Sequence, residues 1–216
     1  MEQKRILCFG DSLTWGYDPV KRCRMPENER WTGVLQSELG DGYKVIEEGH
    51  NGRTVAVDDP AEGEKNGLKY IIPCLESQSP LDIMILMLGS NDLKTKFGFC
   101  AMDIAGEMQI FLEKVQTHNR YRMGGKMKIL LIAPPMLGGK AYGTWLDECF
   151  DFKRTPSICK DIPGWYKKLA SMYDCEFMDA SLIVEPSEAD GVHLDPSEQI
   201  KLGKAICSKL KESGLI

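Results

Sequence analysis

A serine directly after an apolar stretch is the first residue in this sequence whose setting suggests chemistry. Phe9 and Gly10 end the apolar stretch, and Asp11 and Ser12 follow. A glycine permits a tight turn there, and such a turn leaves a hydroxyl exposed beside backbone N–H groups that can bind an anion. Ser12 is therefore either a nucleophile or the cap of a short helix. The segment is not a phosphate-binding loop, because it lacks the GxGxxG spacing and the lysine.

An aspartate and a histidine near the carboxyl end of the chain supply the partners that a serine nucleophile needs. They lie three residues apart in Asp190-Gly-Val-His193, on either side of a turn. A serine hydroxyl attacks only when a base takes its proton, and a carboxylate must hold that base in one tautomer. We expect Asp190 to hold Nδ1 of His193, which leaves Nε2 free to face Ser12. His118 is expected on an exposed helix surface.

Two further segments carry groups that can stabilise an oxyanion. Asn91 follows a buried apolar run, and its side-chain amide can donate to a carbonyl oxygen that becomes tetrahedral. Gly52 follows another strand-like run and can bring a backbone N–H close to the same oxygen, because it has no Cβ. Asparagine and glycine are also common in plain turns, so each of these two signals is weak when taken alone.

Several neighbours of these segments are candidates for contacts with a substrate. Trp15 is interpreted either as a wall of the acyl pocket, where it would favour acetyl-sized groups, or as a core residue. His50 is expected to line the pocket, and Arg53 to contact a polar substrate, although an arginine in a loop is usually solvated. Asp11 and Asp92 are expected to hold turns rather than to take part in the reaction.

Strand-like and helix-like runs alternate along the chain and place these residues. The predicted strands are residues 5–9, 43–48, 82–88, 127–133 and 175–178, and the predicted helices are 31–39, 101–117, 156–173 and 196–211. Such alternation predicts a parallel sheet with helices on both faces. Ligands bind beyond the carboxyl ends of the strands in these sheets, and the segments singled out above follow strands. The irregular stretches 18–30 and 136–155 should rim the same face. Asp195 is expected to cap the last helix.

The composition limits the class of protein. The chain has 216 residues, of which 43% are hydrophobic and 27% charged. We expect one globular domain over residues 1–216. A net charge of -5 without basic runs argues against a nucleic-acid partner. The longest apolar run, residues 83–88, is too short to cross a membrane.

The cysteines and the first residues favour a cytoplasmic protein. Eight cysteines form no CxxC pair and no zinc-site spacing, so we expect reduced thiols, with Cys8 and Cys175 in core strands. The chain begins Met-Glu-Gln-Lys-Arg and then enters a strand-like run. It has neither the apolar stretch nor the small-residue cleavage site of a signal peptide.

Together the segments resemble the GDSL/SGNH hydrolases, whose four named residues are matched in family order by Ser12, Gly52, Asn91 and His193. Segments 5–16, 30–35, 45–49 and 58–60 resemble bacterial arylesterases, some of which transfer acyl groups to alcohols or to hydrogen peroxide. The resemblance implies a three-layer, flavodoxin-like α/β fold with a central parallel five-stranded sheet. It also implies no metal, no cofactor, a homo-oligomer and hydrolysis of small acyl esters.

We therefore expect a serine esterase with an acyl-enzyme on Ser12 and, in some reactions, transfer of the acyl group to alcohols or peroxide. The nearest alternative is a carbohydrate or natural-product O-deacetylase with the same triad, which polar rim residues such as Asp147, Glu148 and Lys153 would favour. A nucleotide- or flavin-binding module is disfavoured because the glycine fingerprint is missing. An inactive scaffold is disfavoured because all the triad and oxyanion residue types are present.

Overall fold

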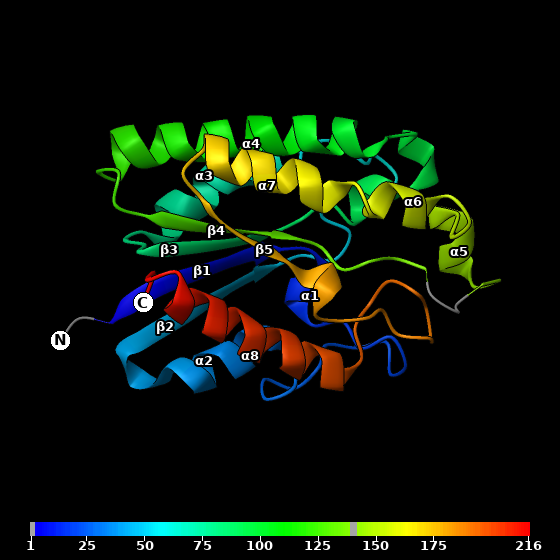
Figure 1. Ribbon diagram of the computed structural model, residues 1–216, viewed down its shortest axis with the longest axis horizontal. Coiled ribbons are helices and arrows are strands. Elements are labelled where there is room, and N and C mark those ends of the chain that lie inside the picture. The colour runs from blue at the N-terminus through cyan, green and yellow to red at the C-terminus, as the bar shows by residue number, and fades with distance from the viewer. Residues whose placement is uncertain (1–2, 139–141) are drawn as a thin grey trace.

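A parallel sheet with the strand order β2-β1-β3-β4-β5 forms the centre of the molecule (Figure 1). The structure is a computed structural model and describes residues 3–138 and 142–216. Its strands are β1 (Lys4–Gly10), β2 (Tyr43–Gly49), β3 (Ile83–Met87), β4 (Lys128–Ala133) and β5 (Glu176–Asp179). Each lies within one residue of the predicted bounds at both ends, so the predicted parallel α/β sheet is confirmed.

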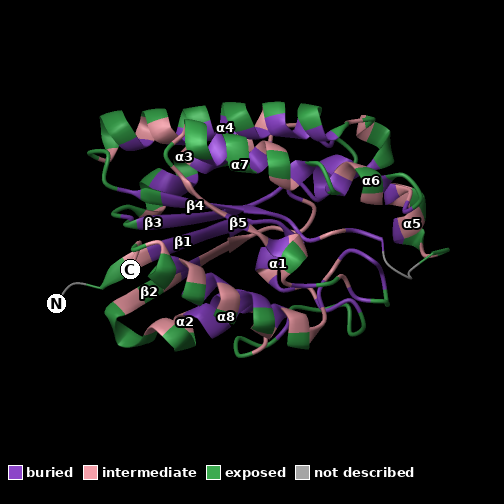
Figure 2. Cartoon of the chain, viewed as in Figure 1, coloured by how far each residue is buried: buried purple, intermediate pink, exposed green. Residues whose placement is uncertain are grey.

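Alternate residues of each strand pack against helices on opposite faces of the sheet. Leu7 and Phe9 of β1 enter one core cluster, and Ile6 and Cys8 enter the other. Helices α3 (Gly67–Gln78), α4 (Ala101–Arg122) and α7 (Ile162–Met172) cover the first face, and α2 (Trp31–Leu39) and α8 (Pro196–Glu212) cover the second (Figure 1). The strands are therefore mostly buried, while the outer sides of the helices are exposed (Figure 2).

The helices differ from the prediction in three places. Helix α3 was not expected, and Pro73 lies inside it. The single helix expected over 156–173 is two helices, α6 (Thr155–Cys159) and α7, because Pro163 fits only the first turn of a helix and a new helix begins there. The stretch 136–155, expected to be irregular, contains α5 (Trp145–Phe150), and its residues 139–141 lie outside the described part.

An aspartate stands at the N-cap position of two helices, but only one of the two side chains bonds to its helix. Asp11 caps the short helix α1 (Ser12–Trp15) by accepting the N–H of Leu13, so the cap is Asp11 and not Ser12. Asp195 stands at the N-cap position of α8, as expected. Its side chain makes no hydrogen bond to that helix and instead accepts the hydroxyl of Ser187 at 2.7 Å.

The state of the cysteines and the lengths of the helices can be compared with the sequence expectations. All eight cysteines are free thiols, and Cys8 is buried in β1, whereas Cys175 is only partly buried and precedes β5. Within residues 3–138 and 142–216, no helix is both long and apolar enough to span a bilayer.

Candidate active site

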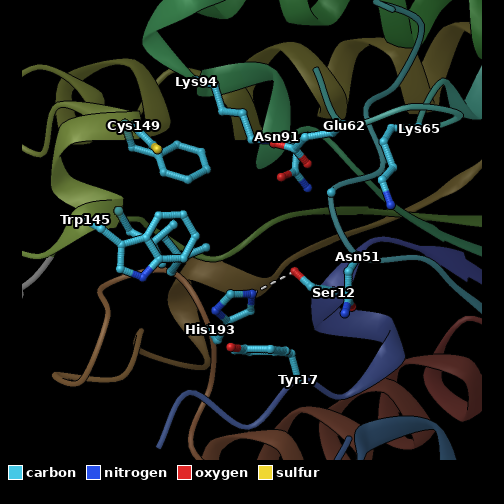
Figure 3. A pocket seen from close by; sticks show the side chains of 14 residues that line it. Ser12, Tyr17, Asn51, Glu62, Lys65, Asn91, Lys94, Trp145, Cys149 and His193 are labelled. Atoms are coloured by element: carbon cyan, nitrogen blue, oxygen red, sulfur yellow. Dashed lines mark hydrogen bonds and ion pairs between the residues drawn. The ribbon is translucent and has the colours of Figure 1, made fainter. Parts of the chain in front are cut away.

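The structure brings Ser12, His193 and Asp190 into one hydrogen-bonded row at the carboxyl end of the sheet. His193 Nε2 lies 2.9 Å from Ser12 Oγ, and His193 Nδ1 lies 2.6 Å from Asp190 Oδ2 (Figure 3). Ser12 follows β1 directly, and the other two residues come from the loop between β5 and α8. Ser12 is 7% exposed and Asp190 is 8% exposed, so little water competes for these hydrogen bonds.

A tight turn orients the Asp190 carboxylate. Its Oδ1 accepts the backbone N–H groups of Val192 and His193, each at 2.9 Å, which leaves Oδ2 for the imidazole. Gly191 lies in this turn at φ +74°, where a Cβ would come within 2.5 Å of the carbonyl oxygen of Gly138. Burial pushes the pKa of Asp190 upward. The bonds from His193 and from the backbone N–H groups outweigh burial and hold this pKa below its ordinary value.

Tyr17 covers one face of the imidazole. The ring centroids of Tyr17 and His193 are 4.4 Å apart, with 42° between the ring planes (Figure 3). With Nδ1 and Nε2 both bonded, this contact fixes the remaining tilt of the His193 ring. The sequence reasoning missed Tyr17. Its position five residues after Ser12 in the same loop is the only signal that pointed to it.

Two backbone N–H groups at this end of the sheet are available to an incoming oxygen. The N–H groups of Ser12 and Gly52 donate no hydrogen bond to the described residues, and both residues line the same cavity. Gly52 lies in a turn closed by the hydrogen bond from Arg53 N to His50 O and has φ +81°, which a glycine adopts without strain.

The side-chain amide of Asn91 lies at the same end of the sheet. Asn91 begins the short 3-10 helix Asn91–Leu93 after β3, and its Nδ2 donates to the carbonyl oxygen of Arg53 at 3.1 Å. The other contact of Nδ2, with Asp11 Oδ2, is long at 3.5 Å. One amide hydrogen therefore fixes the side chain, and the other is weakly held.

Of the two aspartates expected to hold turns, Asp11 holds its own turn, whereas Asp92 binds a segment distant in the sequence. Asp11 caps α1, and Asp92 Oδ1 accepts the backbone N–H of Val55 at 2.9 Å. Burial raises the pKa of Asp11 to about 6, although bonds from Leu13 N–H and nearby positive charge act in the other direction. Burial, followed by a contact with Glu107, raises the pKa of Asp92 well above its ordinary value.

Asp11→Asn is expected to stabilise the fold in a pH-dependent way. The folded protein holds the Asp11 proton more tightly than the unfolded chain does, so the contribution of Asp11 to stability falls as pH rises from about 4 to about 6. Asparagine carries no charge and can still accept the Leu13 N–H. Between about pH 4.5 and 7.5, the free energy of unfolding of Asp11→Asn should rise by about 2 kcal/mol relative to the wild type. Urea denaturation at both pH values measures this difference.

Asp18→Asn is the matched control for that measurement. Burial raises the pKa of Asp18, but the N–H groups of Lys21 and Val20 and the Lys21 side chain outweigh burial and lower it. Asp18 is therefore ionised in both states across this range, and its variant should differ from the wild type by a constant amount. A constant difference for Asp11→Asn as well would contradict the buried, raised-pKa assignment.

Ser12 and His193 open into a cavity of about 260 Å³ with two unlike walls. One wall is largely apolar and comes from α5 and the loop before His193: Trp145, Leu146, Cys149, Phe150 and Val192. The other is polar: Asn51, Glu62, Lys65, Asn91 and Lys94. Figure 3 shows Trp145 and Cys149 on one side of the cavity and Asn51 and Lys65 on the other, with Ser12 beside Asn51. The stretch 136–155 therefore rims this face, as expected, through α5.

Three residues expected at the substrate lie outside this cavity. The Trp15 ring lies near the Tyr17 ring, with 6.4 Å between the ring centroids and 32° between the ring planes. The Arg24 guanidinium lies 5.5 Å from the centre of the Trp15 ring. His50 lines a different cavity and contacts Lys65 Nζ through Nε2 at 3.1 Å. Arg53 is 4% exposed rather than solvated.

The Arg53 side chain links strands β1 and β2. Its Nη1 donates to the carbonyl oxygens of Gly10, at 2.8 Å, and Glu48, and its guanidinium lies 4.1 Å from the centre of the Phe9 ring. These contacts tie the carboxyl ends of β1 and β2 together and hold the turn that carries Gly52.

The polar rim residues singled out from the sequence do not line the cavity either. Asp147 accepts the backbone N–H groups of Gly143 and Phe152, so it shapes its own loop. Glu148 and Lys153 are also absent from the cavity wall. The polar groups beside Ser12 come instead from the loop after β2 and from Lys94, three residues after Asn91.

Comparisons with known proteins identify the family and similar structures. A family model described as GDSL-like lipase/acylhydrolase matches residues 8–199. The chain is similar to a carbohydrate acetylesterase from Sinorhizobium meliloti, with 37% identity, a TM-score of 0.90, and coverage of 98% of this chain and 100% of that one. It is also similar to an aryl esterase from M. smegmatis, with 35% identity, a TM-score of 0.88, and coverage of 97% and 99%. No curated protein matches the chain by sequence.

Proposed function

Because this chain belongs to the GDSL-like lipase/acylhydrolase family and is a carboxylic ester hydrolase, we propose that it cleaves small acyl esters through an acyl-enzyme on Ser12. The observation that carries the proposal is the row of hydrogen bonds from Ser12 Oγ through His193 to Asp190, with heavy-atom distances of 2.9 and 2.6 Å. A nucleophile, a base and an orienting carboxylate within these distances are what acyl transfer requires.

The reaction has two steps. His193 Nε2 takes the Ser12 proton as Oγ attacks the ester carbonyl, and the same proton then goes to the departing alcohol. Water attacks the acyl-enzyme in the second step, and His193 again accepts and returns a proton. In both steps the N–H groups of Ser12 and Gly52 and the amide of Asn91 donate to the oxyanion.

Asn91→Ala should retain weak activity. Its amide is one of three proposed donors, and losing one donor typically lowers kcat by about 10²- to 10³-fold. Because the amide acts mainly on the tetrahedral oxyanion, KM for p-nitrophenyl acetate should change little. Steady-state kinetics measure both constants, and a melting curve checks that the lost bond to Arg53 has not unfolded the protein. A kcat equal to that of the wild type would remove Asn91 from the oxyanion hole.

The size of the cavity favours short acyl groups. About 260 Å³ must hold the acyl chain and part of the alcohol, and Phe150 and Leu146 close the apolar side. Along a series of p-nitrophenyl acetate, butyrate and octanoate, kcat/KM should fall by at least about 10-fold from the first to the last, because overpacking is costly. Equal or rising values would show that the cavity extends to accept long chains.

A carbohydrate O-deacetylase is the second candidate. The polar wall of Asn51, Glu62 and Lys65 favours it, because hydroxyl-rich alcohols need hydrogen-bond partners at the leaving-group side. A similar protein from Sinorhizobium meliloti is itself a carbohydrate acetylesterase. Acetate release from an acetylated sugar, compared with p-nitrophenyl acetate as kcat/KM, separates this candidate from an esterase of simple aryl esters.

Transfer of the acyl group to acceptors other than water is part of the proposal. The apolar wall beside Ser12 can hold an alcohol near the acyl-enzyme, where it competes with water as nucleophile. Formation of a new ester, or of a peracid when hydrogen peroxide is supplied, would be followed by chromatography. Release of free acid alone would limit the enzyme to hydrolysis.

We also propose a homo-oligomer in the cytoplasm. Trp145 lines the cavity and is nevertheless 67% exposed, which leaves an aromatic surface beside the site for a second copy to cover. Light scattering on a size-exclusion column tests the assembly, and a monomer at working concentrations would contradict it.

Labelling with a fluorophosphonate tests the proposed nucleophile directly. Such probes react with activated serines, so peptide mapping should find the label on Ser12. Denatured protein is the control, because the row of hydrogen bonds is lost there and labelling should stop. Labelling of another serine in the native protein would overturn the assignment.

A further inference from the structure

Four charged side chains form a network beside the cavity. Asp59 and Glu62 come from one turn of the loop after β2, and Lys94 and Lys96 come from the segment that follows Asn91. Lys94 Nζ contacts Glu62 Oε1 and lies 3.5 Å from Asp59 Oδ2, while Lys96 Nζ lies 2.5 Å from Asp59 Oδ2. Two positive and two negative charges balance within the network.

The network ends at the turn that carries Gly52. A Cβ on that residue would lie 2.5 Å from Glu62 Oε2, so this carboxylate occupies the space that a side chain at position 52 would fill. Glu62 Oε1 is held by Lys94, and both side chains point to the cavity in Figure 3. Gly52 lines the same cavity. A negative charge therefore stands beside the proposed oxyanion donor.

An uncompensated carboxylate at this position would oppose the reaction, because its negative charge lies beside the developing charge of the oxyanion. The Glu62 side chain is 38% exposed, so solvent screens part of this repulsion. The side chain of Lys94 is 8% exposed and touches the carboxylate directly. Lys96 lies farther from Glu62, at 3.8 Å, and its side chain is 41% exposed, so solvent screens it. Lys65 also passes beside Gly52 and is charged, but among the described residues its ammonium contacts His50 Nε2, at 3.1 Å, and forms no ion pair with Glu62.

We propose that Lys94 is a positioning residue that cancels the charge of Glu62 at the oxyanion end of the cavity. This rests on the proposed function, in which Gly52 donates to the oxyanion. Lys94 does not touch the reacting atoms. It acts through Glu62, which it keeps neutralised and fixed against the Gly52 turn, while the Asp59–Lys96 pair anchors the other side of the network.

The test is a double-mutant cycle on kcat for p-nitrophenyl acetate, a neutral ester. Lys94→Met leaves Glu62 charged and should lower kcat by about 10-fold with KM nearly unchanged, since the loss is electrostatic and specific to the transition state. Glu62→Gln alone removes the charge together with one polar group of the cavity wall, so it should lower kcat by less than Lys94→Met does. The double variant should recover to within about 3-fold of the wild type, because the charge that Lys94 cancels is gone.

Two control variants separate this role from simple stabilisation of the loop. Lys94→Arg keeps the charge and should remain active, and Lys69→Met, which removes a lysine that pairs with Asp58 and does not line the cavity, should change kcat little. A double variant no more active than Lys94→Met, or a Glu62→Gln variant as weak as Lys94→Met, would overturn the proposal. An active Ser12→Ala variant would instead contradict the proposed function itself, whatever the double-mutant cycle of Lys94 and Glu62 shows.

Discussion

Ser12→Ala is expected to lower kcat for p-nitrophenyl acetate by about 10⁶-fold, because the proposed acyl-enzyme forms on the oxygen that this substitution removes. The substitution removes one oxygen from a residue that is 7% exposed and leaves the backbone bonds to Gly16 and Tyr17 unchanged. The fold and the oxyanion donors therefore remain, and a weak residual rate over water is expected from them. Steady-state kinetics and the melting temperature test these two expectations together.

Ser181→Ala is the matched control for that variant. Ser181 follows β5 and donates its hydroxyl to Asp179 at 2.6 Å, outside the cavity. It should keep wild-type kinetics and take up the fluorophosphonate label normally. If Ser12→Ala kept more than about a hundredth of the wild-type kcat, the nucleophile would have to be another residue or an activated water.

The strands could be predicted from the sequence because a strand that is buried on both faces is a continuous run of apolar residues. Residues 83–87 of β3 are all buried apolar side chains, a pattern that few other structures produce. The positions of Ser12 and Asn91 followed, since both come directly after such strands. The rule that ligands gather at the carboxyl ends of a parallel sheet then placed them together.

The helices that were missed or joined carry conflicting local signals. Helix α3 has Pro73 in its interior, which costs a backbone hydrogen bond, but Ile71, Cys74 and Leu75 are buried against the sheet. Tertiary burial outweighs the local preference there. The break between α6 and α7 is the opposite case, because Pro163 itself marks the first turn of a new helix.

The cavity walls could not be predicted, because they depend on how loops fold back. Arg53 looked like a solvated loop residue, yet carbonyl oxygens of two strands and the Phe9 ring converge on its guanidinium. Glu62 lies far from Ser12 in sequence, and nothing local indicates that its carboxylate rests against Gly52. Such contacts follow from tertiary packing and not from residue type or spacing.

Asp190→Asn is expected to lower kcat by about 10⁴-fold without unfolding the protein. The reason lies in how the carboxylate is bonded. Oδ1 accepts the N–H groups of Val192 and His193, and asparagine would keep its own oxygen there because only oxygen can accept them. Its NH₂ group would then face Nδ1 of the imidazole, where Asp190 Oδ2 now lies at 2.6 Å.

That exchange reverses the tautomer of His193. An NH₂ group donates, so Nδ1 would have to accept, and the imidazole proton would move to Nε2, which faces Ser12 Oγ at 2.9 Å. A protonated Nε2 cannot take the serine proton, although every heavy atom stays in place. The pH dependence of kcat for the variant and the wild type measures the effect. Asp18→Asn is the control, because Asp18 Oδ1 also accepts two backbone N–H groups but makes no contact with His193 among the described residues. The hydrogen bonds from the backbone N–H groups of Val192 and His193 survive in Asp190→Asn. We therefore expect this variant to lose activity and to keep the melting temperature of the wild type. Activity within about 10-fold of the wild type would mean that the carboxylate only supports the turn and does not set the tautomer of the base.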